Sequence, residues 1–479
     1  MVYYSDLGLV NTAALCFVNH FLRNNYMPAK VDTSKKVFGK CTFPGGVHPP
    51  HRKLTESIPV ERVFLTPGND VVIPMVQHIG APCKPTVKPK DVVTAGQIVG
   101  ASDSFVSAPV HSPCNGVVKS IVPLFHPSGR KIESVVITVA EEQPEPMKWK
   151  HFPIDFDINS IESEKIAGIA GNTGLVGEGG AAFPTRVKLT ANPAKPIDMV
   201  ILNGCECEPY LTSDHRLMLE SPESIVVGLR LAMKAVNAPK GIIAIEDNKQ
   251  DAVNKLFDLI KKIDGLHIAV CKTKYPQGGE KQLIKAVTGR DVPIWGLPMD
   301  AGVVVSNVGT ASSLAWSCLD GRALTERVVT VTGKGIERPG NFMVPIGMKV
   351  EDLLAHCGGI NDNASKVLLG GPMMGPTAYR LDVPVMKGTS GITVMTDEEY
   401  RLLDETACIR CSRCVDNCPV NLLPTTIAHA IKARDIQKAL DYHLMTCIEC
   451  GCCTYVCPAQ IPLVQYMRSG KTKARDMKK

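Results

Sequence analysis

The stretch that decides the fold of the C-terminal part of this chain is Cys408-Ile-Arg-Cys-Ser-Arg-Cys-Val-Asp-Asn-Cys418-Pro419. A second copy of the pattern follows as Cys447-Ile-Glu-Cys-Gly-Cys-Cys-Thr-Tyr-Val-Cys457-Pro458. In both copies three cysteines stand at two-residue gaps, a fourth comes after three more residues, and a proline follows it. Repeated cysteines at these gaps indicate metal or cluster ligation rather than disulfide bonding.

The spacing favours two [4Fe–4S] clusters, because it brings thiolates onto a cube of iron and sulfur. Three cysteines at two-residue gaps form a tight loop that reaches three irons, and the fourth lies too far along the chain to close the same site. The fourth cysteine of each run therefore ligates the other cluster. We expect one cluster on Cys408, Cys411, Cys414 and Cys457 and the other on Cys447, Cys450, Cys453 and Cys418, with Cys452 left over.

The alternative for the same cysteines is a zinc ribbon, which pairs two Cys-x2-Cys knuckles to give four ligands. Four cysteines in each run, the proline after each run and the helix-like segment Thr425–Leu444 between them favour clusters instead. Such a domain would pass electrons one at a time.

The bulk composition is that of a multidomain globular protein. The chain has 479 residues, 44% of them hydrophobic, and a net charge of +6. This mild basicity permits docking to an acidic protein or an anionic membrane and does not argue for nucleic acid. Half of the 18 cysteines crowd into residues 408–457, which favours a reducing cytoplasm over a secreted, disulfide-rich fold. The nearest candidate for a membrane-active segment, Leu7–Leu22, is too short and polar to span a bilayer.

The pattern of apolar residues divides the chain into parts. Short β-branched runs bounded by Gly, Pro and Asn predict an all-β region over residues 41–140. Residues 160–310 alternate strand-like and helical patterns, which predicts an α/β domain with a largely parallel sheet. A smaller unit over residues 325–395 is β-grasp-like, and residues 400–470 are helical with cysteine-rich loops. The tail from Arg468 to Lys479 is basic, and we expect it to be disordered.

A glycine-rich loop, Gly177-Glu-Gly-Gly-Ala-Ala-Phe183-Pro184, lies at the start of the α/β region. As a dinucleotide fingerprint it is weak, because Pro184 would fall within the first turns of the helix that such a loop should open. The objection does not apply to a second interpretation, in which the glycine-rich loop lets a flavin approach the backbone. A tight surface loop is the alternative.

These motifs together resemble two known families. The strips Gly177–Leu189, Asn203–Tyr210, Tyr275–Glu280 and Ser306–Thr310 resemble the flavin and NADH site of the NADH-oxidising subunit of respiratory complex I. Over roughly residues 38–470 the chain resembles the RnfC family, which belongs to the Rnf complex, the ion-translocating ferredoxin:NAD oxidoreductase of bacteria. That likeness is carried by Phe43–Pro50, Gln77–Pro82, Phe105–Pro113 and Gly370–Gly375.

The resemblance implies a fold class: multidomain α/β plus β. It implies an N-terminal extension at 1–38, which is disordered or results from a misassigned start, and then a barrel-sandwich (lipoyl-like) domain at 39–145. A Rossmann-like α/β FMN/NADH domain would follow at 150–322, and a β-grasp (soluble ligand-binding) module at 323–395. A helical domain with two [4Fe–4S] clusters would cover 396–467, and a basic tail would cover 468–479.

The resemblance also implies site residues. FMN would be held by Gly177, Gly179, Lys188, Asn203, Tyr275, Gly278 and Asn307, and Phe183, Glu206, Glu208 and Glu280 would line the nicotinamide side as catalytic residues. The complex I strips have an aspartate where Cys205 stands and a second glutamate where Gly279 stands. From the residues alone, Lys188, Glu206 and Glu208 could equally face solvent.

The function implied is a peripheral subunit on the cytoplasmic face of the inner membrane. It would pass electrons between NAD(H), FMN and two [4Fe–4S] clusters, to or from the other Rnf subunits, including an iron–sulfur ferredoxin-like subunit. Two alternatives stay open. One is a soluble flavin and iron–sulfur corrin (cobalamin) reductase, in whose family the glycine-rich flavin domain comes near the N-terminus. The other is an electron-transfer adaptor that binds no nucleotide.

Overall fold

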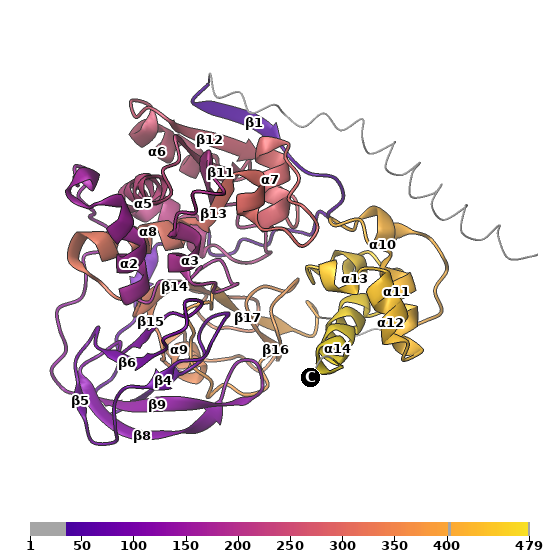
Figure 1. The fold of residues 1–479 in the computed structure, drawn as a ribbon. Coiled ribbons are helices and arrows are strands. Elements are labelled where there is room, and N and C mark those ends of the chain that lie inside the picture. The colour runs from indigo at the N-terminus through magenta and orange to yellow at the C-terminus, as the bar shows by residue number, and fades with distance from the viewer. Residues whose placement is uncertain (1–34, 401–403, 478–479) are drawn as a thin grey trace, which may run out of the picture.

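The computed structural model describes residues 35–400 and 404–477. Figure 1 shows an α/β lobe, two β-rich lobes beneath it, and a helical lobe, in yellow, at the side. The segment Leu7–Leu22 and most of the predicted extension at 1–38 lie outside the described residues. Within the described ranges, the helices are all too short or too polar to cross a bilayer.

The α/β lobe is a five-stranded sheet with helices on both faces, as the alternating pattern predicts. The strand order is β1-β12-β11-β10-β13, and every neighbouring pair is parallel. Val200 and Leu202 of strand β10 (Met199–Gly204) pack into one core, whereas Met199 and Ile201 pack into the core on the other face. Its elements are β1 (Val37–Cys41), η1 (Ile158–Ser160), α2 (Ser163–Asn172), α3 (Thr185–Leu189), β10 (Met199–Gly204), α4 (Ser213–Glu220), α5 (Pro222–Ala235), β11 (Lys240–Glu246), α6 (Gln250–Ile260), β12 (Leu266–Cys271), α7 (Glu280–Thr288), η2 (Pro298–Ala301), β13 (Val303–Asn307) and α8 (Val308–Asp320).

The order of these strands creates a place for a ligand. From β10 the chain steps outward to β11 and β12, and it then returns to the other side of β10 to form β13. A crevice opens outside the carboxyl ends of parallel strands wherever the order reverses in this way. Asn203 and Asn307 are register partners at the carboxyl ends of β10 and β13, so both stand at the reversal.

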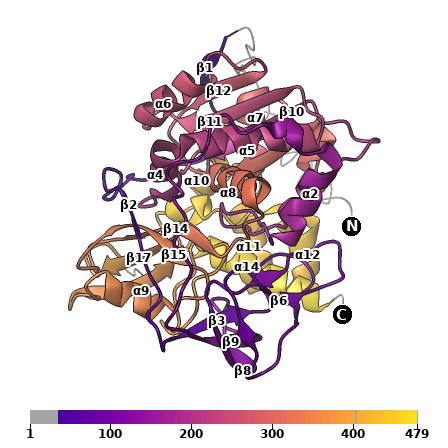
Figure 2. The same ribbon diagram turned by 90° about the vertical axis from the view of Figure 1, so that its left-hand side faces the viewer.

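The N-terminal β lobe consists of two small antiparallel sheets around one core of valines, isoleucines and cysteines. The runs near Val71, Val92, Ile98, Gly116 and Val135 form strands, as expected. The elements are β3 (Asp70–Pro74), β4 (Lys84–Pro85), β5 (Val92–Val93), β6 (Ile98–Ala101), β7 (Val110–His111), β8 (Gly116–Phe125) and β9 (Lys131–Val139). Figure 2 places this lobe below the α/β lobe.

The second β lobe is a five-stranded mixed sheet in the order β16-β17-β14-β15-β2, with one helix packed on it. Its elements are β2 (Val60–Arg62), β14 (Glu326–Thr332), β15 (Gly340–Pro345), α9 (Val350–His356), β16 (Ala364–Leu369) and β17 (Gly391–Thr396). This agrees with the small β-grasp-like module expected over residues 325–395.

Two strands depart from the predicted boundary of the N-terminal domain at residue 39. Strand β1 pairs with β12 of the α/β sheet, and β2 pairs with β15 of the second β lobe. Both are extended segments that complete the open edge of a sheet formed by distant sequence. The two strands, Val37–Cys41 and Val60–Arg62, therefore belong to the sheets of the other lobes.

The helical lobe carries both cysteine runs. Its elements are α10 (Arg413–Asp416), α11 (Pro424–Lys432), α12 (Ile436–Asp441), η3 (Leu444–Thr446), α13 (Cys452–Tyr455) and α14 (Leu463–Asp476). The expectation of a disordered tail from Arg468 is wrong through Asp476. Helix α14 continues there because Met467, Lys471 and Ala474 extend its buried face. Lys471 is a charged residue, but its aliphatic stem packs as an apolar group.

Candidate cofactor sites

A cavity of about 400 Å³ opens at the reversal of the parallel sheet. Its walls come from the glycine-rich loop, helix α3, the ends of β10 and β13, and the turn before α7. Leu297, Pro298 and Met299 line it from the segment at η2, and Ile79 lines it from the N-terminal β lobe. Eight of the predicted flavin and nicotinamide residues line it: Gly177, Gly179, Phe183, Lys188, Asn203, Gly278, Glu280 and Asn307.

Backbone hydrogen bonds fix the two asparagines that face this cavity. Asn203 donates from Nδ2 to the carbonyl of Gly278 at 2.8 Å and accepts from the amide of Cys205 at 3.0 Å. Asn307 is the N-cap of α8, and its Oδ1 accepts from the amides of Gly309 and Thr310 at 2.8 and 3.3 Å. The cavity therefore has a rigid polar rim at the N-terminus of a helix, which favours a phosphate.

Lys188 is the cationic side chain of the cavity wall. Its ammonium donates to Glu280 Oε1 at 2.7 Å and to the carbonyl of Val305 at 2.9 Å. The short helix α3 places it there because Pro184 fixes the start of that helix directly after the glycine-rich loop. The objection to a dinucleotide fingerprint therefore holds, since the loop leads through Pro184 into only one short helix.

Glycine is required in this wall at residue 278. A Cβ on Gly278 would lie 2.4 Å from the carbonyl oxygen of Cys205, which is far inside contact distance. Larger residues are excluded there, and the backbone of the turn stays open to the cavity.

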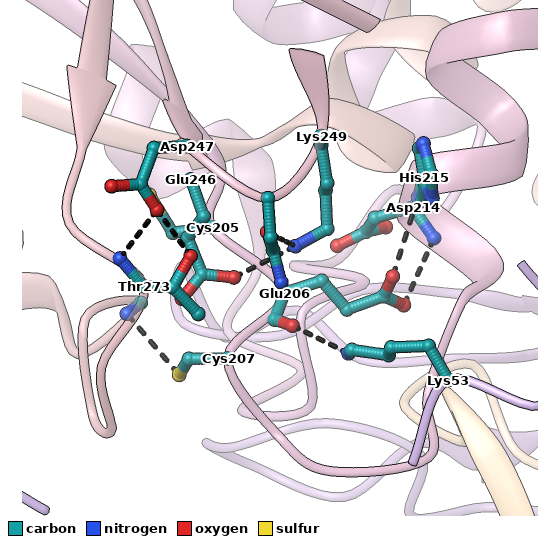
Figure 3. Close-up of polar contacts among 12 residues, drawn as sticks. Lys53, Cys205, Glu206, Cys207, Asp214, His215, Glu246, Asp247, Lys249 and Thr273 are labelled. Carbon is teal, nitrogen blue, oxygen red and sulfur yellow. Dashed lines mark hydrogen bonds and ion pairs between the residues drawn. The ribbon is translucent and has the colours of Figure 1, made fainter. Parts of the chain in front are cut away.

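Three predicted residues do not line the cavity: Tyr275, Glu206 and Glu208. Glu206 instead caps helix α4, as Figure 3 shows. Its carboxylate accepts from Ser213 Oγ and from the amides of Asp214 and His215 at 3.0, 3.0 and 3.3 Å. A carboxylate at a helix N-terminus is stabilised by the orphan amides of the first turn.

Glu208 is turned toward the second β lobe. Its Oε1 accepts from the amides of Met373 and Met374 at 2.7 and 3.0 Å. Burial raises the pKa of this carboxyl, while the two amide hydrogen bonds oppose the rise. In the sequence, alternation along an extended strip predicts that Glu206 and Glu208 meet one ligand. The strip folds away from strand geometry after Gly204, so the two carboxylates meet different partners.

Charged residues lie around this strip (Figure 3). Lys53 donates to the carbonyls of Glu206, Glu208 and Leu211 at 2.8, 2.9 and 2.5 Å. Lys249 pairs with Glu246 at 2.7 Å, and both side chains are almost fully buried. The three hydrogen bonds from Lys53 hold the backbone of the strip in place.

Sequence reasoning missed Asp214. Its Oδ2 accepts from Asn307 Nδ2 at 2.7 Å, so it supports a residue of the cavity wall from behind. Burial, and then the nearby carboxylate of Glu206, raises the pKa of Asp214 to about 7. No signal near residue 214 could have shown this, because its partner Asn307 is 93 residues away.

A second cavity lies in the helical lobe and joins the two cysteine runs. Cys418 of the first run lines it together with Cys447, Cys450, Cys452 and Cys453 of the second. In the neighbouring core Cys414 packs with Cys408, Cys453 and Cys457. The meeting of Cys418 with the second run and of Cys457 with the first supports the crossed ligand assignment, which stays a prediction. Cys452 is fully buried, and its Sγ points to the carbonyl of Tyr275 at 3.9 Å.

The two sets of cysteines differ in exposure. Cys411 is exposed, as is Ile409 beside it, whereas Cys418 and Cys450 are buried. Burial raises the pKa of the Cys447 thiol to about 11. Iron bound at this site would oppose that rise, because a metal ion favours the deprotonated form of a coordinating thiol. In the described part of the chain, no group of three or more His, Cys, Asp or Glu side chains is arranged to hold a single metal ion.

The chain was compared with known protein families, and four matches follow its lobes. Residues 41–142 match the RnfC barrel sandwich hybrid domain, and residues 171–316 match the Nuo51 FMN-binding domain. Residues 328–377 match the SLBB domain, and residues 407–461 match the 4Fe-4S dicluster domain. The site therefore defines a flavin and iron–sulfur electron-transfer protein, and the zinc-ribbon alternative is set aside.

Curated relatives give the family. The chain is 46% identical over 388 residues to the subunit designated C in the Na(+)-translocating ferredoxin:NAD(+) oxidoreductase complex of Acetobacterium woodii, covering 81% of this chain and 86% of that one. It is 41% identical over 440 residues to the subunit of the same designation in the proton-translocating complex of Clostridium ljungdahlii, covering 91% and 94%. The chain belongs to this RnfC family, whose members are subunits of ion-translocating ferredoxin:NAD(+) oxidoreductases, the Rnf complexes.

A third relative is the subunit with this designation in the ion-translocating oxidoreductase complex of Rhodobacter capsulatus. It is 39% identical over 432 residues, which cover 90% of this chain and 82% of that one. Among solved structures, a chain of the NAD+-reducing [NiFe]-hydrogenase in its H2-reduced state matches at a TM-score of 0.46 and 17% identity, covering 68% of this chain and 62% of that one.

The residues present fit the cofactors of this family. The first cavity combines an apolar wall, in which Phe183, Val304 and Val305 take part, with the cationic Lys188 and the start of α8. This mixture suits a flavin ring and its phosphate. Two runs of cysteines with the ferredoxin spacing provide enough thiols for two [4Fe–4S] clusters.

Proposed function

We propose that the chain is the NAD(H)-linked subunit of a membrane-bound, ion-translocating electron-transport complex. It would pass electrons between NAD(H), FMN and two [4Fe–4S] clusters, to or from the ferredoxin side of the complex. The reaction and the NAD(H) substrate are those in the names of its relatives. One of these relatives is named for Na(+) and the other for protons, so the coupling ion of this chain does not follow from the family.

The cavity residues have separate tasks in this proposal. Bound FMN would exchange two electrons with nicotinamide as a hydride and pass single electrons onward. Lys188 would hold the phosphate or a ring carbonyl of the flavin, while Asn203 and Asn307 would fix its edge through their anchored amides. Phe183 and Glu280 line the same cavity and would bind the nicotinamide half of the substrate. Since a hydride needs no general acid or base, these side chains orient the substrate and exclude water.

One observation supports the proposal above the others: the flavin cavity and a cluster site share one short segment of chain. Gly278 lines the cavity, and Tyr275, three residues earlier, donates from its hydroxyl to the carbonyl of Cys450 at 2.8 Å. The site of Cys418, Cys447, Cys450 and Cys453 would therefore exchange electrons directly with the flavin. We call it the proximal site, and we call the site of Cys408, Cys411, Cys414 and Cys457 the distal site.

The distal site suits exchange with a partner, because Cys411 is exposed. Arg410 and Arg413, on either side of Cys411, are basic, which favours an acidic electron carrier such as an iron–sulfur ferredoxin-like subunit. We propose that this partner, together with the membrane subunits of the complex, holds the chain at the cytoplasmic face of the inner membrane.

Two other functions are weaker. A soluble corrin reductase does not account for the RnfC-type barrel sandwich domain, which precedes the flavin domain. An adaptor without nucleotide binding does not account for a cavity of about 400 Å³ whose wall retains Lys188 and both asparagines.

The test is the reduction of ferricyanide by NADH with the anaerobically reconstituted protein, with and without FMN. We expect activity that depends on FMN, together with about eight iron and eight acid-labile sulfides per chain. Protein that contains FMN and does not oxidise NADH would favour the adaptor. NADH oxidation coupled only to a corrin would favour the corrin reductase.

A further inference from the structure

We infer that Tyr275 is a positioning residue for the proximal cluster and does not bind the flavin. With Gly45, Gly46 and Val47 it forms a clamp that fixes the cluster lobe against the flavin domain. The inference deepens the proposed function, because it assigns the residues that set how the two redox sites face each other. It rests on contacts made by the chain itself.

The first part of the clamp is a two-way backbone bridge. Val47 and Tyr275 each donate an amide hydrogen to the carbonyl of the other, both at 2.8 Å. The side chains of both residues are buried in one small core, together with Cys450 and Cys452. A segment from the beginning of the chain is thus fastened to the turn that leads into the flavin cavity.

The second part of the clamp reaches the other cysteine run. The amide of Gly46 donates to the carbonyl of Asn417 at 3.0 Å, next to Cys418. Both glycines have positive φ, +77° for Gly45 and +80° for Gly46. A Cβ on Gly45 would lie 3.0 Å from the carbonyl oxygen of Cys418, and a Cβ on Gly46 would lie 2.6 Å from that of Tyr275. Only glycine fits between the two lobes at these positions.

The third part of the clamp is the Tyr275 hydroxyl. It donates to the carbonyl of Cys450 at 2.8 Å. The tyrosine side chain is 1% exposed, so this hydrogen bond is shielded from water. Gln282, on the helix after the same turn, adds a bond from Nε2 to the carbonyl of Pro419 at 3.3 Å.

These contacts all converge on the proximal site. In the first run they reach the backbone beside Cys418, and in the second run they reach the carbonyl of Cys450. Cys418 and Cys450 are two of the four cysteines of the proximal site. Groups that hold the ligands of a metal site from outside tune its potential and its geometry. Tyr275 therefore acts on the proximal cluster, through Cys450, rather than on the distal one.

The test compares Tyr275→Phe, which removes only the hydroxyl, with Tyr442→Phe. Tyr442 is 36% exposed in the same helical lobe, so the control removes a hydroxyl away from the clamp. Iron, sulfide and FMN are counted in both variants. Electron paramagnetic resonance of dithionite-reduced protein then gives the signal and midpoint potential of each cluster, and Cys447→Ser identifies the proximal one.

We expect Tyr275→Phe to keep full FMN and iron, to shift the potential and line shape of the proximal signal, and to leave the distal signal unchanged. Freeze-quench reduction of the proximal cluster by NADH should slow by about tenfold. Val47→Ala keeps the backbone bridge and loosens its packing, so it should give a smaller change of the same kind. Tyr442→Phe should match the unmodified protein.

Two outcomes would overturn the inference. If Tyr275→Phe loses FMN while both cluster signals stay unchanged, Tyr275 is a flavin residue. If it is indistinguishable from Tyr442→Phe, the contact with Cys450 is packing alone. The spectra of dithionite-reduced protein need no NADH, so they decide the role of the clamp even if the proposed NADH reaction fails.

Discussion

The ammonium of Lys188 lies 2.7 Å from Glu280 Oε1 and 2.9 Å from the carbonyl oxygen of Val305. One side chain thus connects helix α3, strand β13 and helix α7 across the wall of the cavity. The pair is partly open to solvent, with 31% of the Lys188 side chain and 39% of the Glu280 side chain exposed. An ion pair with this exposure adds little stability, which leaves Lys188 available for an anionic ligand.

We predict that Lys188→Ala weakens the binding of FMN. Loss of one charge-assisted hydrogen bond costs about 1.5–3 kcal/mol, which corresponds to an affinity lower by about tenfold to a hundredfold. FMN fluorescence after desalting and a titration of the apoprotein measure this. Lys165→Ala is the matched control, because Lys165 pairs with Glu162 on the surface, away from the cavity wall. Unchanged flavin affinity in the Lys188 variant would show that this lysine does not contact FMN.

A prediction at Glu208 separates a structural role, as the acceptor for two backbone amides, from a role in binding the nucleotide. Replacement by alanine leaves the amides of Met373 and Met374 without an acceptor, at a cost of about 1–3 kcal/mol. Hydrogen exchange over Gly370–Gly375 should therefore accelerate in Glu208→Ala and stay close to normal in Glu208→Gln, whose amide oxygen can still accept. FMN content should be unchanged in both. A raised KM for NADH in Glu208→Gln, with normal exchange, would instead make this residue a nucleotide contact.

The repeating patterns of the chain allowed most of its architecture to be predicted. The parallel sheet followed from the alternating strand and helix patterns of residues 160–310. Helix α8 gives little helical signal in the sequence, because it is buried nearly all round and has small residues, so it has no polar face to reveal its period. Local sequence patterns also could not predict that β1 and β2 pair with distant sheets, because their partner strands are more than two hundred residues away.

Residues of the candidate site could be predicted where they lie together in one short sequence motif. The lysine and glycines named from short motifs line one cavity together, and their contact with FMN stays a prediction. Glu206, Glu208 and Tyr275 lie in the same motifs and face elsewhere. Glu206 is turned toward the first-turn amides of helix α4, Glu208 toward the amides of Met373 and Met374, and Tyr275 toward the carbonyl of Cys450.

Asp214 gives a prediction of pH dependence. Burial raises its pKa from 3.8 to about 7, so the folded state holds a proton that the unfolded state releases. Its contribution to stability is therefore present below about pH 4 and is lost as the pH rises to about 7, at up to about 1.4 kcal/mol per pH unit.

Asp214→Asn lacks this titration and can still accept from Asn307. The unfolding temperature of the variant, relative to the unmodified protein, should rise with pH across that window and level off above it. Asp258→Asn, an exposed carboxylate paired with Lys261, is the control and should show no such trend. A constant difference at all pH values would mean that Asp214 is ionised throughout.

The last prediction concerns the crossing of the cysteine runs. Cys418 lines one cavity with Cys447, Cys450, Cys452 and Cys453, although it is closer in sequence to Cys414. We predict that Cys418→Ser and Cys447→Ser lose or alter the same electron paramagnetic resonance signal, while Cys408→Ser alters the other. Cys452→Ala should keep both signals and about eight iron per chain, because its thiol faces the carbonyl of Tyr275. If Cys418→Ser behaves like Cys408→Ser, each run holds its own cluster, and the assignment of the proximal site to Cys418 fails.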